Sequence, residues 1–84
     1  MNMELKDTVD MMLSDDYTER FRAEYWQAKI RYNKLNMVLK LHDAGKLGFE
    51  LNCPVELLRK QKKHMGKYID ILEHRAKHIE GVTL

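Results

Sequence analysis

The sequence predicts an all-α protein in which a short N-terminal helix precedes a long antiparallel two-helix hairpin. Apolar and aromatic residues recur in steps of three and four over two long stretches, which is the period of an amphipathic helix. A short segment with two of the four glycines separates these stretches and breaks the period. Because so short a connection makes the helices run antiparallel, we expect coiled-coil-like packing between them.

We expect a single domain that needs further copies of itself. At 84 residues the chain has room for one domain, residues 1–84. Its predicted segments are a short helix over 3–14, a long helix over 16–43, a loop over 44–53 and a second long helix over 54–80. A hairpin of this size buries too little apolar surface to be stable alone, so we predict a homo-oligomer.

The first long helix has start and stop signals in the sequence. Asp16 is suited to cap its first amides, and Glu19 three residues later completes a capping-box arrangement. Gly45 marks its end, and basic side chains in the last turn favour the helix dipole. The side chains expected to face the second helix are Phe21, Tyr25, Ala28, Tyr32, Leu35, Leu39 and His42.

The second long helix is expected to begin at Pro54, whose missing N–H has no intrahelical partner in a first helical position. Gly66 in its middle costs roughly 1 kcal/mol relative to alanine, which indicates close backbone packing or a tolerated weak point. The expected inward residues are Leu58, Gln61, Met65, Tyr68, Leu72, Arg75 and Ile79. Two of them, Gln61 and Arg75, are polar, and a buried arginine needs a carboxylate or a ligand beside it.

The N-terminal segment differs from the hairpin in charge. Residues 1–24 carry seven acids and three bases, whereas residues 25–84 carry six acids and twelve bases. We expect this acidic segment to dock on the basic hairpin of the same or a neighbouring subunit, and the basic surface can also meet an anionic ligand. The apolar face of its short helix is predicted to be Leu5, Val9, Met12 and Leu13.

Several classes of protein are disfavoured by the sequence. It contains no glycine-rich phosphate loop, nucleophile elbow or cysteine pair, so we expect no enzyme and no cofactor. His74 and His78 lie one turn apart but lack a complete ligand set, so no metal site is expected. The lone Cys53 fits a reducing compartment. With no apolar run near the ~20 residues needed to cross a bilayer, we expect a cytoplasmic protein without a membrane partner.

Two basic surfaces are candidates for ligand binding. Arg22, Trp26 and Lys29 follow one another at steps of four and three on one face, where an indole between two cations can stack a base and pair phosphates. The alternative is that Trp26 lies at a subunit contact with its charged neighbours as the rim. The second surface is a basic run on the second helix, which with Arg31 and Lys34 opposite can line an anion-binding groove. That run is Arg59, Lys60, Lys62, Lys63 and Lys67.

Four stretches of the chain carry a resemblance to a protein family. They are DYTERFRAEY at 16–25, KIRY at 29–32, DAGKL at 43–47 and the segment 61–76. In these stretches the chain resembles a small uncharacterised family of phages and prophages of gut Firmicutes, related to a crAss-like-phage gene product. The resemblance implies a phage origin and names no activity.

A looser resemblance rests on the tripeptide Asn52-Cys53-Pro54, which opens the second long helix after a short N-terminal helix and a long first one. In this layout the chain is similar to the helical-hairpin sponges with which phages sequester the cyclic-nucleotide signals of CBASS and Thoeris defence. Those proteins are oligomers with ligand pockets between subunits. The resemblance implies that amides after Pro54 meet a phosphate, although Glu56 in the same turn opposes an anion.

These observations lead to one hypothesis and one alternative. The hypothesis is a non-enzymatic phage counter-defence protein that sequesters a cyclic nucleotide in the bacterial host cytoplasm. The alternative is a small helical protein–protein inhibitor or adaptor acting on a host or phage protein. Nucleic acid is a disfavoured partner because a net charge of +2 is low for that task. The expected ligand-binding residues are Arg22, Trp26, Lys29 and Arg75, followed by Tyr17, Arg20, Asn52 and Lys62.

Overall fold

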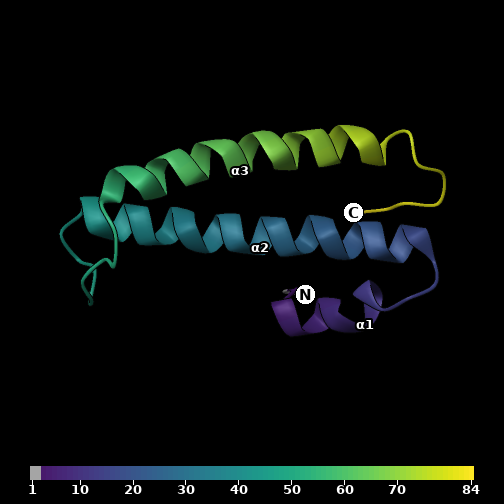
Figure 1. Cartoon of the computed structure of the whole chain (residues 1–84), viewed down its shortest axis with the longest axis horizontal. Helices are drawn as coiled ribbons and strands as arrows, with labels where there is room; N and C mark the ends of the chain where they lie inside the picture. The colour runs from purple at the N-terminus through teal and green to yellow at the C-terminus, as the bar shows by residue number, and fades with distance from the viewer. Residues whose placement is uncertain (1–2) are drawn as a thin grey trace.

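The computed structural model describes residues 3–84 and is all-helical over that range, as predicted. A 3-10 turn, η1 (Leu5–Thr8), leads into α1 (Val9–Met12), and the hairpin consists of α2 (Tyr17–Asp43) and α3 (Val55–Ala76). In Figure 1, α2 lies in the middle, with α3 antiparallel on one side and α1 on the other. We call the end where the loop joins the two long helices the closed end, and the opposite end the open end.

The N-terminus of α2 is capped by Asp16, as the sequence predicted. The Asp16 carboxylate accepts from the backbone N–H of Thr18 at 2.9 Å and from its hydroxyl at 2.8 Å. The predicted reciprocal contact from Glu19 is wrong, because the Asp16 N–H donates instead to the Ser14 hydroxyl at 3.0 Å. The hydroxyl of Ser14, two residues before Asp16, therefore accepts the hydrogen bond that was expected to go to Glu19.

The C-terminus of α2 ends at a glycine in the left-handed region, Gly45 with φ of 69°. The Gly45 N–H donates to His42 O at 3.0 Å, and the Lys46 N–H donates to Leu41 O at 2.8 Å. This pair of bonds is a Schellman motif, which satisfies two of the last carbonyls of the helix.

Helix α3 is shorter at both ends than the predicted span 54–80. Pro54 is the N-cap and not the first helical residue, since its ψ of 138° is extended. The helix ends at Ala76, and residues 77–81 form turns, with Gly81 at a φ of 86°. The chain then folds back at the open end, where Ile79 and Val82 pack against the core (Figure 1).

The hydrophobic core lies toward the open end of the hairpin. Its buried cluster is Phe21, Tyr25, Ile69 and Leu72. Leu35 and Leu39 are also buried farther along α2. The predicted inward face of α2 is therefore confirmed except at its end, where His42 is exposed.

The predicted inward face of α3 is confirmed at Leu72, which is buried, and at Leu58 and Met65, which are half-buried. It is wrong at its polar positions, since Gln61, Tyr68 and Arg75 are exposed. Ile69, which was not expected to face α2, is buried, whereas Tyr68 and Gln61, which were expected to face it, are exposed. At these two positions the residue that faces α2 is thus the next one in the sequence: Lys62 in place of Gln61, and Ile69 in place of Tyr68. The observed face runs through the long aliphatic stem of Lys62 and through Gly66, positions that a count of apolar residues passes over.

The N-terminal arm docks on α2 through a face other than the predicted one. Val9, Met12 and Leu13 are exposed, and Thr8 is fully buried. The Thr8 hydroxyl donates to Leu5 O at 2.7 Å and accepts from the Gln27 amide at 3.0 Å. The cause is the 3-10 turn, whose period of three residues brings Leu5 and Thr8 to one side.

Candidate functional site

A polar groove lies between α2 and α3 in the closed half of the hairpin. Its volume is about 430 Å³. Its lining residues are Tyr32, Asn36, Leu39, Lys40, Asp43, Arg59, Lys62, Lys63 and Gly66. Four of these side chains are cationic and one is anionic, so the groove carries a positive potential that attracts anions.

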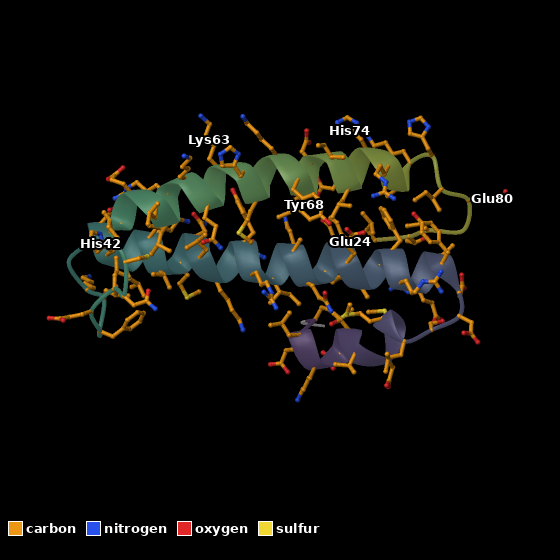
Figure 2. All side chains as sticks on the ribbon, in the orientation of Figure 1. Glu24, His42, Lys63, Tyr68, His74 and Glu80 are labelled. Atoms are coloured by element: carbon orange, nitrogen blue, oxygen red, sulfur yellow. The ribbon has the colours of Figure 1, made fainter. Side chains whose placement is uncertain are left out.

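Three of the four cations have no carboxylate partner. Within residues 3–84, no carboxylate lies in ion-pair distance of Lys40, Lys62 or Lys63. Lys63 lies on the outer side of α3, at the rim of the groove (Figure 2). Their ammonium groups are therefore available to an anion from solvent.

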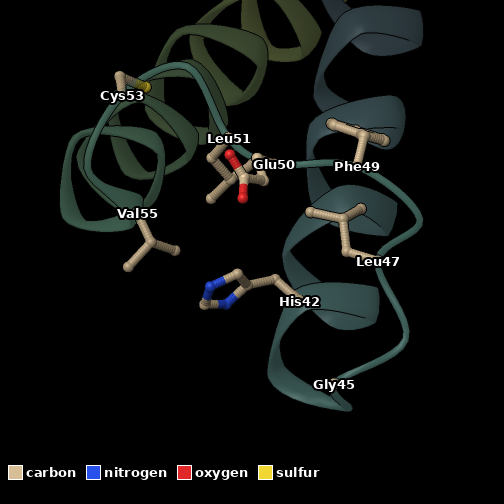
Figure 3. Close-up of a pocket in the computed structure, with 8 residues that line it drawn as sticks. All are labelled: His42, Gly45, Leu47, Phe49, Glu50, Leu51, Cys53 and Val55. Carbon is tan, nitrogen blue, oxygen red and sulfur yellow. The ribbon is translucent and has the colours of Figure 1, made fainter.

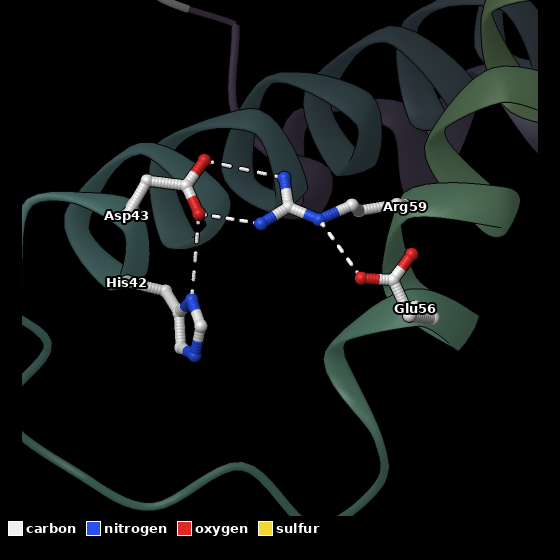
Figure 4. A network of polar contacts seen from close by, with 4 residues as sticks. All are labelled: His42, Asp43, Glu56 and Arg59. Carbon is white, nitrogen blue, oxygen red and sulfur yellow. Dashed lines mark hydrogen bonds and ion pairs between the residues drawn. The ribbon is translucent and has the colours of Figure 1, made fainter.

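The fourth cation, Arg59, is held by a carboxylate across the groove. Its two terminal nitrogens contact the two oxygens of Asp43 at 2.5 and 3.2 Å (Figure 4). The hydrogen bond from Arg59 lowers the pKa of Asp43 below its ordinary value, and His42, at 3.5 Å, contributes in the same direction. The same hydrogen bond raises the pKa of Arg59. On the other side, Arg59 Nε lies 3.5 Å from a carboxylate oxygen of Glu56.

The floor of the groove depends on a residue without a side chain. A Cβ placed on Gly66 would lie 3.4 Å from the ring of Tyr32. The glycine predicted to mark close backbone packing thus faces an aromatic ring of the opposite helix, and it leaves the groove open above that ring.

A second, more apolar pocket lies in the connecting loop at the closed end. Its volume is about 460 Å³, and Figure 3 shows its lining residues around the His42 ring. They are His42, Gly45, Leu47, Phe49, Glu50, Leu51, Cys53 and Val55. Because His42 also contacts Asp43, this loop pocket and the groove adjoin each other across the end of α2.

At the open end, three of the predicted ligand residues come together. Arg75 donates to the Tyr17 hydroxyl at 2.8 Å, and its guanidinium lies 4.9 Å from the centre of the Phe21 ring. Arg20 donates to Ser14 O at 2.8 Å and lies 5.9 Å from the centre of the Tyr17 ring. The expectation of a buried Arg75 that needs a carboxylate or a ligand is therefore wrong: Arg75 is exposed and contacts a tyrosine hydroxyl and an aromatic face.

The flank formed by Arg22, Trp26 and Lys29 is less open than a stacking platform requires. Trp26 is partly buried against the core and meets Tyr25 edge to face, with ring centres 5.3 Å apart. Among the described residues, the Trp26 indole N–H and Arg22 Nε are buried without an acceptor. Buried donors without acceptors are costly, which makes this flank a place where an added acceptor would stabilise the protein.

Two reciprocal tyrosine–glutamate pairs join the long helices between the groove and the open end. The Tyr25 hydroxyl of α2 donates to Glu73 of α3 at 2.7 Å. The Tyr68 hydroxyl of α3 donates to Glu24 of α2, and Figure 2 shows these two side chains between the helices. Burial, followed by the adjacent carboxylate, raises the pKa of each tyrosine to about 12.

The eight predicted ligand residues thus occupy four places. Tyr17, Arg20 and Arg75 form the open-end cluster, while Arg22, Trp26 and Lys29 follow the flank of α2. Lys62 lines the groove, and Asn52 is exposed in the loop. The structure brings the members of the first two sets near one another and leaves the sets apart.

The sequence prediction of a basic groove was right for Arg59, Lys62 and Lys63 on α3 and wrong for Lys60 and Lys67, which do not line the groove. It was also wrong on α2. Instead of Arg31 and Lys34, the groove contains Lys40, with Asp43 opposite Arg59. The short loop fixes this register, because residues equally far from the turn lie opposite each other in a hairpin. Counting residues outward from the loop along both helices would have placed Lys40 opposite the start of the basic run on α3.

A comparison with known families identifies the chain. The model of the family described as Sequestin matches residues 15–78, so this chain belongs to the Sequestin family. The match spans α2, the loop and α3 and leaves out η1 and α1. No curated protein and no solved structure matches the chain. The family name fits sequestration of a ligand, a binding role in place of a catalytic one.

Proposed function

Because the chain is a member of the Sequestin family, we propose that it removes a cyclic-nucleotide immune signal from solution by binding it without chemistry. The observation that carries this proposal is the groove, where four cations and one carboxylate surround a cavity of about 430 Å³. That volume falls within the range of roughly 300–1,000 Å³ that is usual for small-molecule sites. Three unpaired lysines favour a ligand with more than one phosphate.

In this proposal, the other predicted ligand residues bind the nucleotide from neighbouring subunits. The open-end cluster of Tyr17, Arg20 and Arg75 presents two guanidinium groups and an exposed phenol ring. This combination suits a phosphate and a stacked base. We propose that ligand pockets form where such a cluster, or the flank with Trp26, meets another copy of the chain.

The oligomer is supported by the surface area. A compact monomer of 10.1 kDa exposes about 5,300 Å², whereas this elongated chain exposes 6360 Å². Its radius of gyration of 15.0 Å exceeds the ~12 Å of a compact 84-residue domain. Large exposed side chains include Leu13, Met37 and Ile71. Association of several copies would cover this surface.

The proposed setting is a bacterial host cell infected by a phage that encodes this chain. Tight binding would keep the signal below the concentration that activates the host defence, as for the CBASS and Thoeris sponges. No helix within residues 3–84 has the length and hydropathy needed to cross a membrane.

Calorimetry with cyclic di- and trinucleotides and cyclic ADP-ribose isomers tests this function. We expect micromolar or tighter binding of at least one ligand. Lys62→Glu should weaken that binding about 10- to 100-fold, because a charge-assisted contact is lost and an anion is added. Lys60→Glu is the matched control, since it makes the same charge change on an exposed position of α3 outside the groove. Equal losses in both variants, or no binding across the panel, would refute the proposal.

The alternative function, an inhibitor or adaptor that binds a host or phage protein, is favoured by one observation. Met12, Leu13 and Val9 form an exposed apolar surface on the arm that the Sequestin match leaves out. A pull-down from a bacterial lysate with the full chain and with a Leu13→Ser variant distinguishes the two. A stoichiometric protein captured only by the wild type would favour the adaptor.

A further inference from the structure

We infer that Arg59 is the phosphate-binding anchor of the groove, and that Asp43 occupies its guanidinium as a built-in placeholder which an incoming phosphate displaces. The inference rests on the proposed function, since it concerns the same groove. It singles out one member of the predicted basic run as the anchor, a residue absent from the eight expected ligand-binding residues, and it gives the one acidic side chain of the groove a role.

The geometry of the pair is the first reason. Both terminal nitrogens of Arg59 face both oxygens of Asp43, at 2.5 and 3.2 Å (Figure 4). A phosphate presents two oxygens in the same planar arrangement, and arginine binds carboxylates and phosphates through this same two-pronged contact. The Asp43 carboxylate therefore stands where the oxygens of a bound phosphate would sit.

The position of Asp43 in its helix is the second reason. Asp43 is the last residue of α2, where the partial negative charge of the helix dipole disfavours an acid. The preceding residues of that turn, Lys40 and His42, have the favourable sign. The stability of α2 therefore does not account for an aspartate at this position, whereas the pairing with Arg59 does.

The exposure of the pair is the third reason. The side chain of Arg59 is 40% exposed and that of Asp43 is 51% exposed. An ion pair this open to water is weak, so exchanging the carboxylate for a phosphate costs little. The phosphate also gains the lysines of the groove, Lys40 and Lys62, with which Asp43 forms no ion pair within residues 3–84.

The displaced carboxylate has a second place to go. Asp43 already lies 3.5 Å from His42 Nδ1, on the side of the loop pocket. Glu56 contacts Arg59 at Nε, a nitrogen outside the two-pronged contact, and Glu56 does not line the groove. Exchange of Asp43 for phosphate therefore leaves the other contact of Arg59 in place.

The test measures the affinity of the full-length chain for inorganic pyrophosphate by calorimetry at low ionic strength. Asp43→Asn should bind pyrophosphate about 3- to 10-fold more tightly than the wild type, because the competing carboxylate is gone. Glu56→Gln is the matched control, since it removes one negative charge beside the same arginine; it should change affinity by less than about 2-fold. In the Arg59→Gln background, Asp43→Asn should give no gain.

Each outcome decides the inference. Equal tightening by Asp43→Asn and Glu56→Gln would reduce the effect to net charge and overturn it. No gain in Asp43→Asn, or no pyrophosphate binding by that variant at millimolar concentration, would overturn it as well. Failure of the proposed function is separate: it is seen as no nucleotide binding by the wild type, whatever the ratio of pyrophosphate affinities.

Discussion

The two halves of the hairpin are built from the same two helices, but different kinds of side chain lie between the helices in each half. Toward the open end, Phe21, Tyr25, Ile69 and Leu72 form a buried cluster, closed by the C-terminal residues. Toward the closed end, four of the nine residues that line the groove are lysine or arginine, and Leu35 and Leu39 are the buried residues of α2 there. Burial of apolar surface stabilises the first half, while the charges of the second remain accessible to water.

Under the proposed function, this difference assigns stability to the open half and binding to the closed half. A cluster of unpaired cations weakens a fold through mutual repulsion, so it needs a stable neighbour. The open half is that neighbour, because it holds the apolar cluster and both tyrosine–glutamate pairs. Substitutions in the open half should therefore lower the free energy of unfolding, whereas substitutions in the closed half should lower the affinity for the ligand.

The largest effect is expected from Leu72→Ala, at a side chain that is 0% exposed. Deletion of a buried leucine costs about 2–5 kcal/mol. This is a large part of the roughly 4–13 kcal/mol expected for a domain of this length. Urea denaturation measures it. Leu57→Ala, on the same helix but 55% exposed, is the control and should change the midpoint little. Similar losses in both variants would place the stability of the hairpin outside the open half.

The next effect is a loss of stability at high pH. The folded-state pKa of Tyr25 and of Tyr68 is raised to about 12, whereas that of an unfolded tyrosine is about 10. The contribution of these two tyrosines to the free energy of unfolding is therefore fully present below pH 10 and is lost as the pH rises through 12. Urea midpoints measured from pH 9 to pH 12 should fall. The Tyr25→Phe/Tyr68→Phe double variant should show a smaller fall, and an unchanged slope would contradict the role of these pairs.

A smaller effect is expected from removing one hydroxyl at pH 7. Tyr25→Phe leaves a buried site without its hydrogen bond to Glu73 and should cost about 1–2 kcal/mol. Tyr68→Phe should cost about 0.5 kcal/mol or less, because Tyr68 is 41% exposed and water replaces the bond. Thermal unfolding of both variants measures the difference. The reverse order would show that the second pair, nearer the groove, is the stronger one.

The smallest effect is a gain in stability from Gly66→Ala. Alanine favours the helix interior by about 1 kcal/mol over glycine, but its Cβ would lie only 3.4 Å from the Tyr32 ring, and this close contact offsets most of the gain. The melting temperature should rise slightly, while the affinity of the groove for a nucleotide should fall because the methyl group covers part of its floor. A gain in both quantities would indicate that the ligand does not reach this floor.

Much of the fold followed from local patterns in the sequence. Asp16 and Gly45 marked the ends of α2, since a cap acceptor and a left-handed glycine are local chemical needs. The inward residues Phe21, Tyr25, Leu35 and Leu39 followed from helical periodicity. The inward face of α3 was less predictable, because Lys62 and Gly66 contribute to it without an apolar side chain.

The candidate site was less predictable than the fold. Its basic run on α3 was visible, but the opposing Lys40 and Asp43 depend on the hairpin register. Arg75 was predicted to be buried in the seam, and only the packed helices show it exposed beside the Tyr17 hydroxyl. Pairings of residues 58 or 48 positions apart, such as Arg75–Tyr17 and Tyr25–Glu73, leave no local trace in the sequence.

The sequence by itself determined the long helices, the ends of α2 and the antiparallel arrangement, because periodicity, capping and a short loop act between residues near in the chain. The tertiary structure decided which side chains meet across the hairpin. It placed Thr8 inside and Val9 outside through a 3-10 turn, and it set Asp43 against Arg59. These outcomes depend on how two helices are rotated and aligned, which the packing of the whole chain fixes.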